Sequence, residues 1–375
     1  MSSPGSSLRE KFLNGALSIT LMSVISGFLL GGIILLLAGF NPLEAYGVIL
    51  KGIFSRPKYV SYVIIYSTPL IMTGLSVAFA LRTGLFNIGA EGQYIMGALA
   101  AAGAGYYLEL PMVLHVLAAV AAAVLVAAFW GGLAGWFKAR FGVNEVISTI
   151  MLNWTALYIS NWAITIDSFG RQGTGKTYAI QPTAQIDILG QWKRTPEGIT
   201  FLREHPMLWD ILKSPVNLGF VFALLLAALV WYLLNKTTLG YELRAVGHNP
   251  QAAEAGGISV KRSMVISMLI AGGLAGAAGA FQVLGVSHRI ATLAIMEGYG
   301  FDGIAVSLIG NNSGPGCVFA GLLFGALKYG GSKIQDVMGA PTEVINIMIG
   351  IIIFFVAMPK LIRMILAYRT RREQS

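Results

Sequence analysis

Residues 111–137 read PMVLHVLAAVAAAVLVAAFWGGLAGWF and contain no Asp, Glu, Lys or Arg. A helix needs about 20 apolar residues to cross the hydrocarbon core of a bilayer, which is ~30 Å thick, and this stretch exceeds that length. The whole chain agrees, since 55% of its 375 residues are hydrophobic, 11% are charged and the mean hydropathy is +0.70. Soluble domains have about 25% charged residues, so the sequence predicts an integral membrane protein.

Further apolar stretches set the expected number of spans. Strong spans are expected at 16–40, 60–81, 111–137, 146–166, 217–234, 264–285 and 343–358, and shorter ones, interrupted by Gly and polar residues, near 94–107, 298–312 and 315–331. Broken helices are typical of transporters, because irregular backbone is tolerated in a membrane only where it faces protein or water. The prediction is therefore an all-α integral membrane protein with about ten transmembrane helices, several of them short or broken.

The basic residues predict an orientation. Ten spans place both termini on one side, and cytoplasmic segments are enriched in Lys and Arg. With both termini inside, the inner segments hold more basic residues than the short outer loops, although the 41–59 loop argues mildly against this. Membrane orientation also accounts for the net charge of +9, so we expect no nucleic-acid partner.

Two hydrophilic segments divide the chain. The first, 167–216, is expected outside as a folded loop or small cap. The second, 235–263, is expected inside and contains a short helix, which Asn249 caps, Pro250 begins and Gly256-Gly257 ends. The expected organisation is a cytoplasmic N-terminal segment 1–15, a first transmembrane half 16–166, the outer loop 167–216, a second half 217–358 that includes the inner loop 235–263, and a basic cytoplasmic tail 359–375.

A short sequence motif occurs twice. Glu91-Gly92 followed by Gly97 recurs as Glu297-Gly298 followed by Gly303, and each copy opens a short Gly- and Ala-rich span. The two spans are five apart in the expected order, so they run in opposite directions. This favours an inverted repeat, an arrangement in which the substrate route forms between the repeats.

Polar residues beside apolar spans are candidates for a solute pathway. The segment RTGLFNIGAEGQ at 82–93 places Asn87, Glu91 and Gln93 there. A carboxylate near hydrocarbon is costly unless paired or hydrated, which makes Glu91 a functional candidate. The alternative is that Glu91 caps the following helix while the glycines allow close packing.

Other pathway candidates offer directional hydrogen bonds or stacking to a neutral polar solute. They are Asn144, Glu145, Asn153, Trp154, Asn161, Gln282 and Asp302. The same side chains would equally serve to join helices to one another.

Residues 170–177, GRQGTGKT, fit the phosphate-loop pattern G-x-x-x-x-G-K-[ST]. That loop binds phosphate only between a strand and a helix. Here it follows a membrane span and lies in the predicted outer loop, so we expect a flexible loop. The four His residues are scattered without metal-ligand spacing, and Cys317 is the single cysteine. We therefore expect no catalytic residues, no metal and no cofactor in this chain.

Three segments together resemble the permease subunits of ABC importers in the branched-chain amino acid, simple-sugar and nucleoside group. They are GLFNIGAEGQYIMGALAAA, LRAVGHNPQAAEAGGISV and GYGFDGIAVSLIGNNSGPG, which stand in order over about 82–316. Within the group, FNIGAEGQ with GYGFDGIAVSLIG most resembles the nucleoside permeases. The long 167–216 loop is similar to that of the larger of the two permeases such systems usually pair.

The resemblance implies a heteromeric importer of a bacterial cytoplasmic membrane, with a second permease, a cytosolic ATPase and an external solute-binding lipoprotein. The ATPase, with its ATP and Mg, would power alternating access. Residues 247–257 would form the coupling helix, although they lack the full EAA-type consensus. The implied coupling residues are Gly247, Asn249, Ala252, Ala253, Glu254 and Gly256.

Three alternatives remain open at this point. A simple-sugar permease would share the family and differ in its solute. An ion-coupled secondary transporter would share inverted repeats and broken helices, with Glu91 and Asp302 as its obvious intramembrane carboxylates. A membrane enzyme would require clustered titratable residues, which the sequence does not offer.

Overall fold

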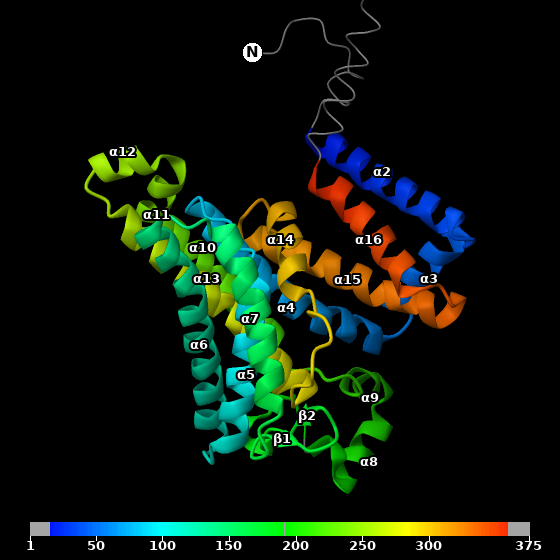
Figure 1. The fold of residues 1–375 in the computed structure, drawn as a ribbon. Helices are drawn as coiled ribbons and strands as arrows, with labels where there is room; N and C mark the ends of the chain where they lie inside the picture. The colour runs from blue at the N-terminus through cyan, green and yellow to red at the C-terminus, as the bar shows by residue number, and fades with distance from the viewer. Residues whose placement is uncertain (1–15, 191, 359–375) are drawn as a thin grey trace, which may run out of the picture. The chain divides into compact units, whose positions relative to one another are not determined.

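The structure, a computed structural model, describes residues 16–190 and 192–358 (Figure 1). The predicted segments 1–15 and 359–375 therefore lie outside the described residues. The chain forms two compact units: unit 1 comprises residues 1–55 and 327–375, and unit 2 comprises residues 56–326. The predicted boundary between two halves, 167–216, falls inside unit 2, so the division into halves stays a prediction.

Unit 1 contains α2 (Ala16–Leu37), α3 (Pro42–Phe54), the second part of α15 (Gly314–Met338) and α16 (Thr342–Ala357). The axes of α2 and α3 differ by 116° across a short break. Gly39, with φ +86°, turns the chain there, and the Asn41 side chain accepts a hydrogen bond from the N–H of Leu43 to start α3. Helix α3 lies in the predicted 41–59 loop, so a helix in this segment was not predicted. Asn41 before Pro42 is a helix-start signal.

Unit 2 contains the other elements, which are mostly helical (Figure 1). In chain order they are α4 (Pro57–Arg82), α5 (Ala90–Tyr107), α6 (Met112–Phe141), α7 (Glu145–Ile164), β1 (Gly170–Arg171), β2 (Lys176–Thr177), the 3-10 turns Pro182–Ala184 and Trp192–Arg194, α8 (Pro196–Glu204), α9 (Pro206–Leu212), α10 (Gly219–Lys236), α11 (Thr238–His248), α12 (Pro250–Ala255), α13 (Val260–Gln282), a π-helical turn (Val283–Ser287), α14 (Tyr299–Ile309) and the first part of α15.

Helix α13 is central in unit 2 and packs against α4, α5 and α6. Glycines permit this contact: a Cβ on Gly272 would overlap the carbonyl oxygen of Ala127, and one on Gly276 would overlap the Ala127 side chain. Small residues at such crossings allow the backbones of membrane helices to approach closely. Helix α4 is almost wholly buried, whereas most of α6 and α10 is not. The inner helices α4, α5 and α13 therefore form the framework that positions the candidate site.

Each of the ten predicted spans coincides with a helix. Among the described residues, four helices are long and apolar enough to cross a membrane: α4, α6, α10 and α13 with its π-helical turn. The bent pair of α2 and α3 would make a fifth, and α14 and α16 are shorter apolar helices. These helices confirm a multi-pass membrane protein, while the number of about ten spans stays a prediction.

Candidate functional site

The two copies of the Glu-Gly motif meet where the N-termini of α5 and α14 face each other. The carboxylate of Glu91, which is fully buried, accepts hydrogen bonds from the backbone N–H groups of Gly298 (2.8 Å) and Gly300 (2.6 Å). A Cβ on Gly300 would overlap the backbone of Glu91, so only glycine fits there. Negative charge at a helix N-terminus is stabilising. Glu91 itself lies in the first turn of α5, and its side chain caps the N-terminus of α14.

A second contact joins the same two motifs. The Tyr94 hydroxyl donates to Oε2 of Glu297 (2.8 Å), and the rings of Tyr94 and Tyr299 lie 5.3 Å apart. The Thr73 hydroxyl of α4 donates to the carbonyl oxygen of Tyr299 (2.9 Å). The start of α14 is therefore fixed by side chains of both α4 and α5.

The predicted pathway amides are buried in a network beside this junction. Nδ2 of Asn87 donates to Oε1 of Gln93 (2.9 Å) and to the Ser76 hydroxyl (3.1 Å), and Nε2 of Gln93 donates to Oδ1 of Asn87 (3.0 Å). Asn153 accepts from the N–H of Gly92 (2.8 Å) and donates to the carbonyl of Ile88 (3.0 Å). These bonds join the side chains to one another and to the 83–92 turn, and their part in a solute pathway stays a prediction.

A cavity of about 350 Å³ lies next to the junction. Its polar lining residues are Tyr94, Ser160, Lys176, Gln282, Ser287, Arg289 and Glu297. Ligand pockets are typically ~300–1,000 Å³ with a few convergent polar groups on apolar walls, and this cavity fits that description. Of the predicted pathway residues, Gln282 is among its lining residues and the others are not. Glu297 was visible in the sequence as the second copy of the motif but was not recognised as a site residue.

The segment 288–298 forms one wall of this cavity and is held by hydrogen bonds along its length. Asn161 of α7 both donates to the carbonyl of Leu293 and accepts from its N–H, each at 2.9 Å. The N–H of Thr177 donates to the carbonyl of Ile290 (3.0 Å), and the N–H of Thr292 donates to the carbonyl of Gly175 (2.8 Å).

The last two bonds come from the GRQGTGKT segment. It folds as a small hairpin in which β1 pairs antiparallel with β2, Arg171 opposite Lys176, and Lys176 also bridges to Ala291. Gly173 and Gly175 have φ values of +70° and +60° and make the turn. The segment after Thr177 is extended and leads to a 3-10 turn instead of a helix. The hairpin therefore lacks the helix N-terminus that a phosphate loop requires.

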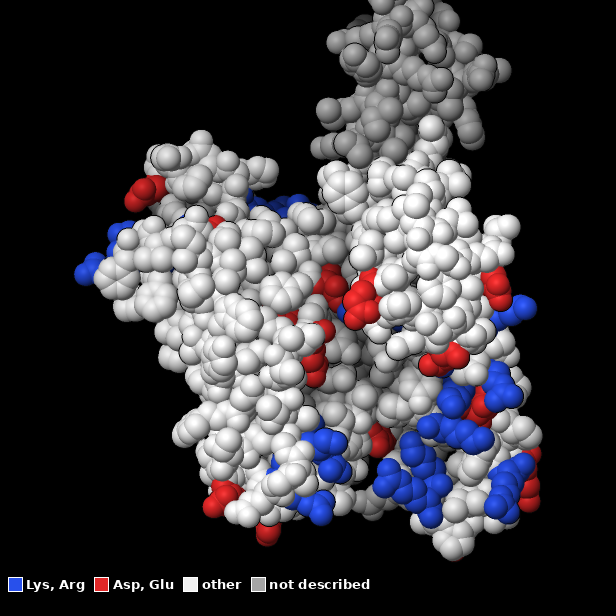
Figure 2. Space-filling model, turned by 45° about the vertical axis from the view of Figure 1, so that its right-hand side comes forward, with Lys and Arg blue, Asp and Glu red and all other residues white. Residues whose placement is uncertain are grey.

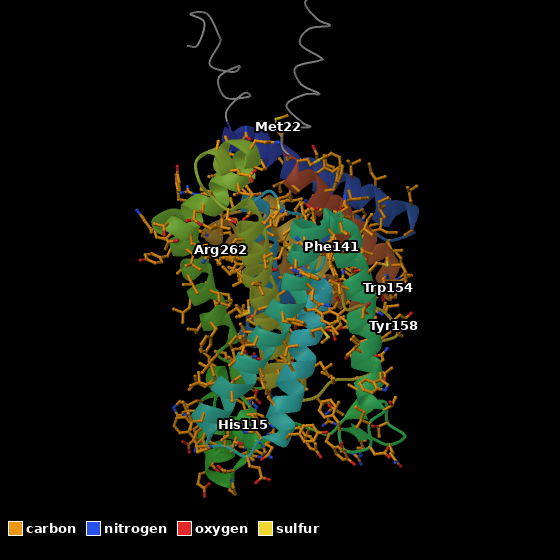
Figure 3. The ribbon with its side chains drawn as sticks, turned by 60° about the vertical axis from the view of Figure 1, so that its left-hand side comes forward. Met22, His115, Phe141, Trp154, Tyr158 and Arg262 are labelled. Atoms are coloured by element: carbon orange, nitrogen blue, oxygen red, sulfur yellow. The ribbon has the colours of Figure 1, made fainter. Side chains whose placement is uncertain are left out.

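The remaining predicted pathway residues lie elsewhere. Asn144 caps α7 by accepting from the N–H of Val146 (2.8 Å). Trp154 is 47% exposed and stacks on Tyr158 with a ring separation of 6.3 Å. Figure 3 shows both rings on the outer side of α7. Asp302 lies in the first turn of α14, near the carboxylate of Glu91. The structure thus gathers Asn87, Glu91, Gln93 and Asn153 and separates Asn144 and Trp154 from them.

The short helix predicted within 235–263 is present as α12, while its role in coupling stays a prediction. Oδ1 of Asn249 accepts from the N–H of Ala252 (3.1 Å), Pro250 begins the helix, and Gly257 follows it with φ +83°. Ala253 is buried against the unit, whereas Ala252, Glu254 and Gly256 are exposed. One face of α12 is therefore available to a partner.

Gly247 connects this segment to the candidate site. A Cβ on Gly247 would overlap the carbonyl oxygen of Arg82, at the start of the turn that leads to Asn87 and Glu91. The Arg82 guanidinium in turn donates to the carbonyls of Asn312 (2.9 Å) and Asn311 (3.3 Å), just after α14. The end of α11, the end of α4 and the turn after α14 therefore share contacts at Arg82.

A larger cavity of about 570 Å³ lies within the 167–216 segment and the end of the α13 extension. Its charged lining residues are Asp187, Lys193, Arg194, Lys213, His288 and Arg289. Figure 2 shows basic side chains gathered over the part of unit 2 that holds α8 and α9. Oδ1 of Asp187 and Nε2 of His288 are 3.3 Å apart. Burial raises the pKa of Asp187 and lowers the pKa of His288, because desolvation penalises the charged form of each.

No cluster of three or more His, Cys, Asp or Glu side chains that could hold a metal ion occurs among residues 16–190 and 192–358.

Comparisons with known proteins also indicate a permease component of a transport system. Residues 59–357 match the family model described as "Branched-chain amino acid transport system / permease component". The chain is 40% identical to the guanosine ABC transporter permease protein NupP of Bacillus subtilis, over 93% of this chain and 95% of that protein. It is 33% identical to the nucleoside ABC transporter permease protein NupB of Lactococcus lactis, over 93% and 92%. It is 30% identical to the glucose ABC transporter permease protein TsgB13 of Haloferax volcanii, over 89% and 85%.

Proposed function

The chain belongs to the family of branched-chain amino acid transport system permease components, and on that premise we propose that it is the permease subunit of an ABC importer that moves nucleosides across a membrane. The observation that supports this most strongly is the 40% identity to a guanosine permease over nearly the full length of both chains. Subunits of this kind transport a solute and leave the hydrolysis of ATP to a partner. The chain is accordingly not an enzyme.

The cavity beside the α5–α14 junction is the proposed solute site. Its volume of about 350 Å³ suits a nucleoside, and its polar groups match the chemistry of one. The Gln282 amide and the Glu297 carboxylate accept hydrogen bonds from ribose hydroxyls or base N–H groups, and the Tyr94 ring offers an aromatic contact to a base. A simple sugar is the second candidate, because the glucose permease relative is 30% identical and hydroxyl groups would use the same partners.

Coupling to an ATPase is proposed to run through Gly247. A cytosolic ATPase bound to the exposed face of α12 would move α11 and α12 as it closes on ATP. Because Gly247 packs on the backbone of Arg82, that movement would reach the 83–92 turn and the facing N-termini of α5 and α14. Displacing these helix ends changes the wall of the solute cavity, which is the physical requirement for alternating access.

The GRQGTGKT hairpin is proposed to serve the cavity wall and not nucleotide binding. Its backbone holds the 288–298 segment, and its Lys176 lines the cavity. We propose that it lies on the outer side of the membrane, with the N- and C-termini inside, and that ATP and Mg are used by the partner alone.

Two further partners complete the proposed assembly. A second homologous permease would pair with this chain, since the resemblance is to the larger member of such a pair. An external solute-binding lipoprotein would deliver the solute to the outer end of unit 2. The exposed rings of Trp154 and Tyr158 on α7 offer a contact to the second permease.

The proposal is tested by uptake of radiolabelled guanosine into cells that lack their own nucleoside uptake and express this chain with its ATPase, second permease and binding protein. Unlabelled nucleosides should compete, and glucose and leucine should not. Inactivating the ATPase should abolish uptake. Competition by glucose alone would favour the sugar permease instead. Uptake by this chain alone, driven by a proton or sodium gradient in liposomes, would show a secondary transporter and refute the proposal.

A further inference from the structure

A groove with basic and apolar walls lies between the C-terminal end of α6 and the N-terminal end of α13. It is lined by Trp136, Ala139, Arg140, Lys261, Arg262, Val265 and Ile266, and we call it the basic groove. Its volume is about 400 Å³. None of these residues takes part in the solute cavity or in the exposed face of α12.

The length of α6 indicates where the groove lies relative to the bilayer. Its 30 residues make a helix about 45 Å long, which exceeds the ~30 Å hydrocarbon core. Arg140 is in the last turn and therefore lies at the level of the lipid headgroups. Trp136 packs against Phe137 and Phe141, with ring separations of 5.4 and 5.2 Å, as in the aromatic belt of a membrane interface. Figure 3 shows Arg262 and Phe141 at one end of unit 2 and His115 at the other.

The charges of the groove are uncompensated. Within the described residues, Arg140, Lys261 and Arg262 have no ion-pair partner, whereas the neighbouring Lys138 is paired with Glu145. All three cations are exposed, and no acidic side chain lines the groove. Three cations with no acid at headgroup depth attract an anionic group.

The apolar residues of the groove show what else the ligand contains. Helix α6 ends here and α13 begins here, so Trp136 lies one turn deeper than Arg140, and Val265 and Ile266 lie one turn deeper than Lys261 and Arg262. Both walls therefore change from charged to apolar in the same direction. A free phosphate ion would not fill the deeper, apolar part of the groove. A lipid phosphate with an acyl chain would fill both parts.

We propose that the basic groove binds an anionic glycerophospholipid, with its phosphate held by Arg140, Lys261 and Arg262 and an acyl chain along Trp136, Val265 and Ile266. Lys261 and Arg262 begin α13 only a few residues after α12. The bound lipid therefore fixes the base of the proposed coupling segment.

The test uses the full chain in a neutral detergent and measures retained lipid by native mass spectrometry, with phosphatidylglycerol, cardiolipin and phosphatidylcholine as probes. Wild type should retain the two anionic lipids at concentrations at least about tenfold lower than phosphatidylcholine, since each Lys or Arg near an anionic surface contributes to binding. The triple variant Arg140→Gln/Lys261→Gln/Arg262→Gln should lose this preference. The matched variant Lys193→Gln/Arg194→Gln/Lys213→Gln, which removes the same charge from the 167–216 segment, should keep it.

Three outcomes would overturn the proposal. The first is an undiminished preference in the triple variant, provided its gel-filtration profile and helix content match those of wild type. The second is displacement of the lipid by inorganic phosphate alone, which would indicate a free-anion site. The third is loss of ATPase binding in the triple variant when only phosphatidylcholine is present, which would assign the groove to the partner protein.

Discussion

Glu91 shows how a fully buried carboxyl side chain can be satisfied by backbone groups that are distant in the sequence. Its two carboxylate oxygens are used by two backbone N–H groups of α14, separated from it by 207 and 209 positions in the sequence. Bonds from N–H groups to a carboxylate are roughly twice as strong as neutral ones. Glu297, at the equivalent place in the second motif, is exposed and faces the cavity. The two copies of the motif therefore have different roles, since Glu91 caps α14 and Glu297 lines the cavity.

Replacing each of the two glutamates separates these tasks. Glu91→Gln keeps the shape but leaves an NH2 group facing an N–H donor, which should cost about 1–3 kcal/mol and lower the Tm of the purified chain by several degrees. Glu297→Gln should leave Tm within about a degree and raise the guanosine concentration for half-maximal uptake. Thermal unfolding in detergent and uptake kinetics measure the two effects. An unchanged Tm in Glu91→Gln would contradict the assigned cap.

At the scale of elements, the sequence predicted features that depend on neighbouring residues, such as helix starts. It did not predict contacts between segments that are distant in the chain. The ten apolar runs predicted ten helices, and Asn249-Pro250 predicted the start of α12, because a cap and the helix it serves are neighbours in the chain. The same signal at Asn41-Pro42 lies in the segment predicted as the 41–59 loop, and the helix α3 there was not predicted. The partner of Glu91 could not be predicted, since only the folded chain brings the starts of α5 and α14 together. The solute cavity was missed for the same reason.

The contact between α11 and the turn after α4 is expected to be essential for coupling. Gly247→Val would force the side chain into the Arg82 carbonyl and separate the two segments. Guanosine uptake should fall at least about tenfold, while ATPase binding persists because the exposed face of α12 is unchanged. Co-purification of the ATPase and uptake assays measure the two quantities.

The control for this variant is Gly103→Val, since a Cβ at Gly103 meets nothing within 4 Å. It should transport normally. If Gly247→Val also transported normally, the route from α12 to the solute cavity would have to pass through other residues.

At the scale of the whole molecule, the arrangement in the membrane remains the main prediction. The described helices include four clear spans and a bent pair, whereas the basic residues and the order of ten helices predict that both termini face the cytoplasm. Much of that charge signal lies in 1–15 and 359–375, outside the described residues. A direct measurement of sidedness is therefore needed.

Cysteine labelling supplies it. The only cysteine, Cys317, is buried, and Cys317→Ser provides a cysteine-free background. In that background, Lys176→Cys in the hairpin should react with a membrane-impermeant maleimide in intact cells. Gln251→Cys on α12 should react only after the membrane is permeabilised. The reverse pattern would invert the proposed orientation and would place the GRQGTGKT hairpin on the side where ATP is present.

The large sequence separation between Glu91 and its hydrogen-bond donors also affects the synthesis and membrane insertion of the protein. Synthesis proceeds from the N-terminus, so the buried carboxylate enters the bilayer long before Gly298 and Gly300 leave the ribosome. Until then it must stay protonated, hydrated or shielded by the insertion machinery, because a bare charge in lipid is costly. The last third of the polypeptide thus supplies the hydrogen-bond donors for an acid in the first third, and a chain that ends early leaves this acid without them.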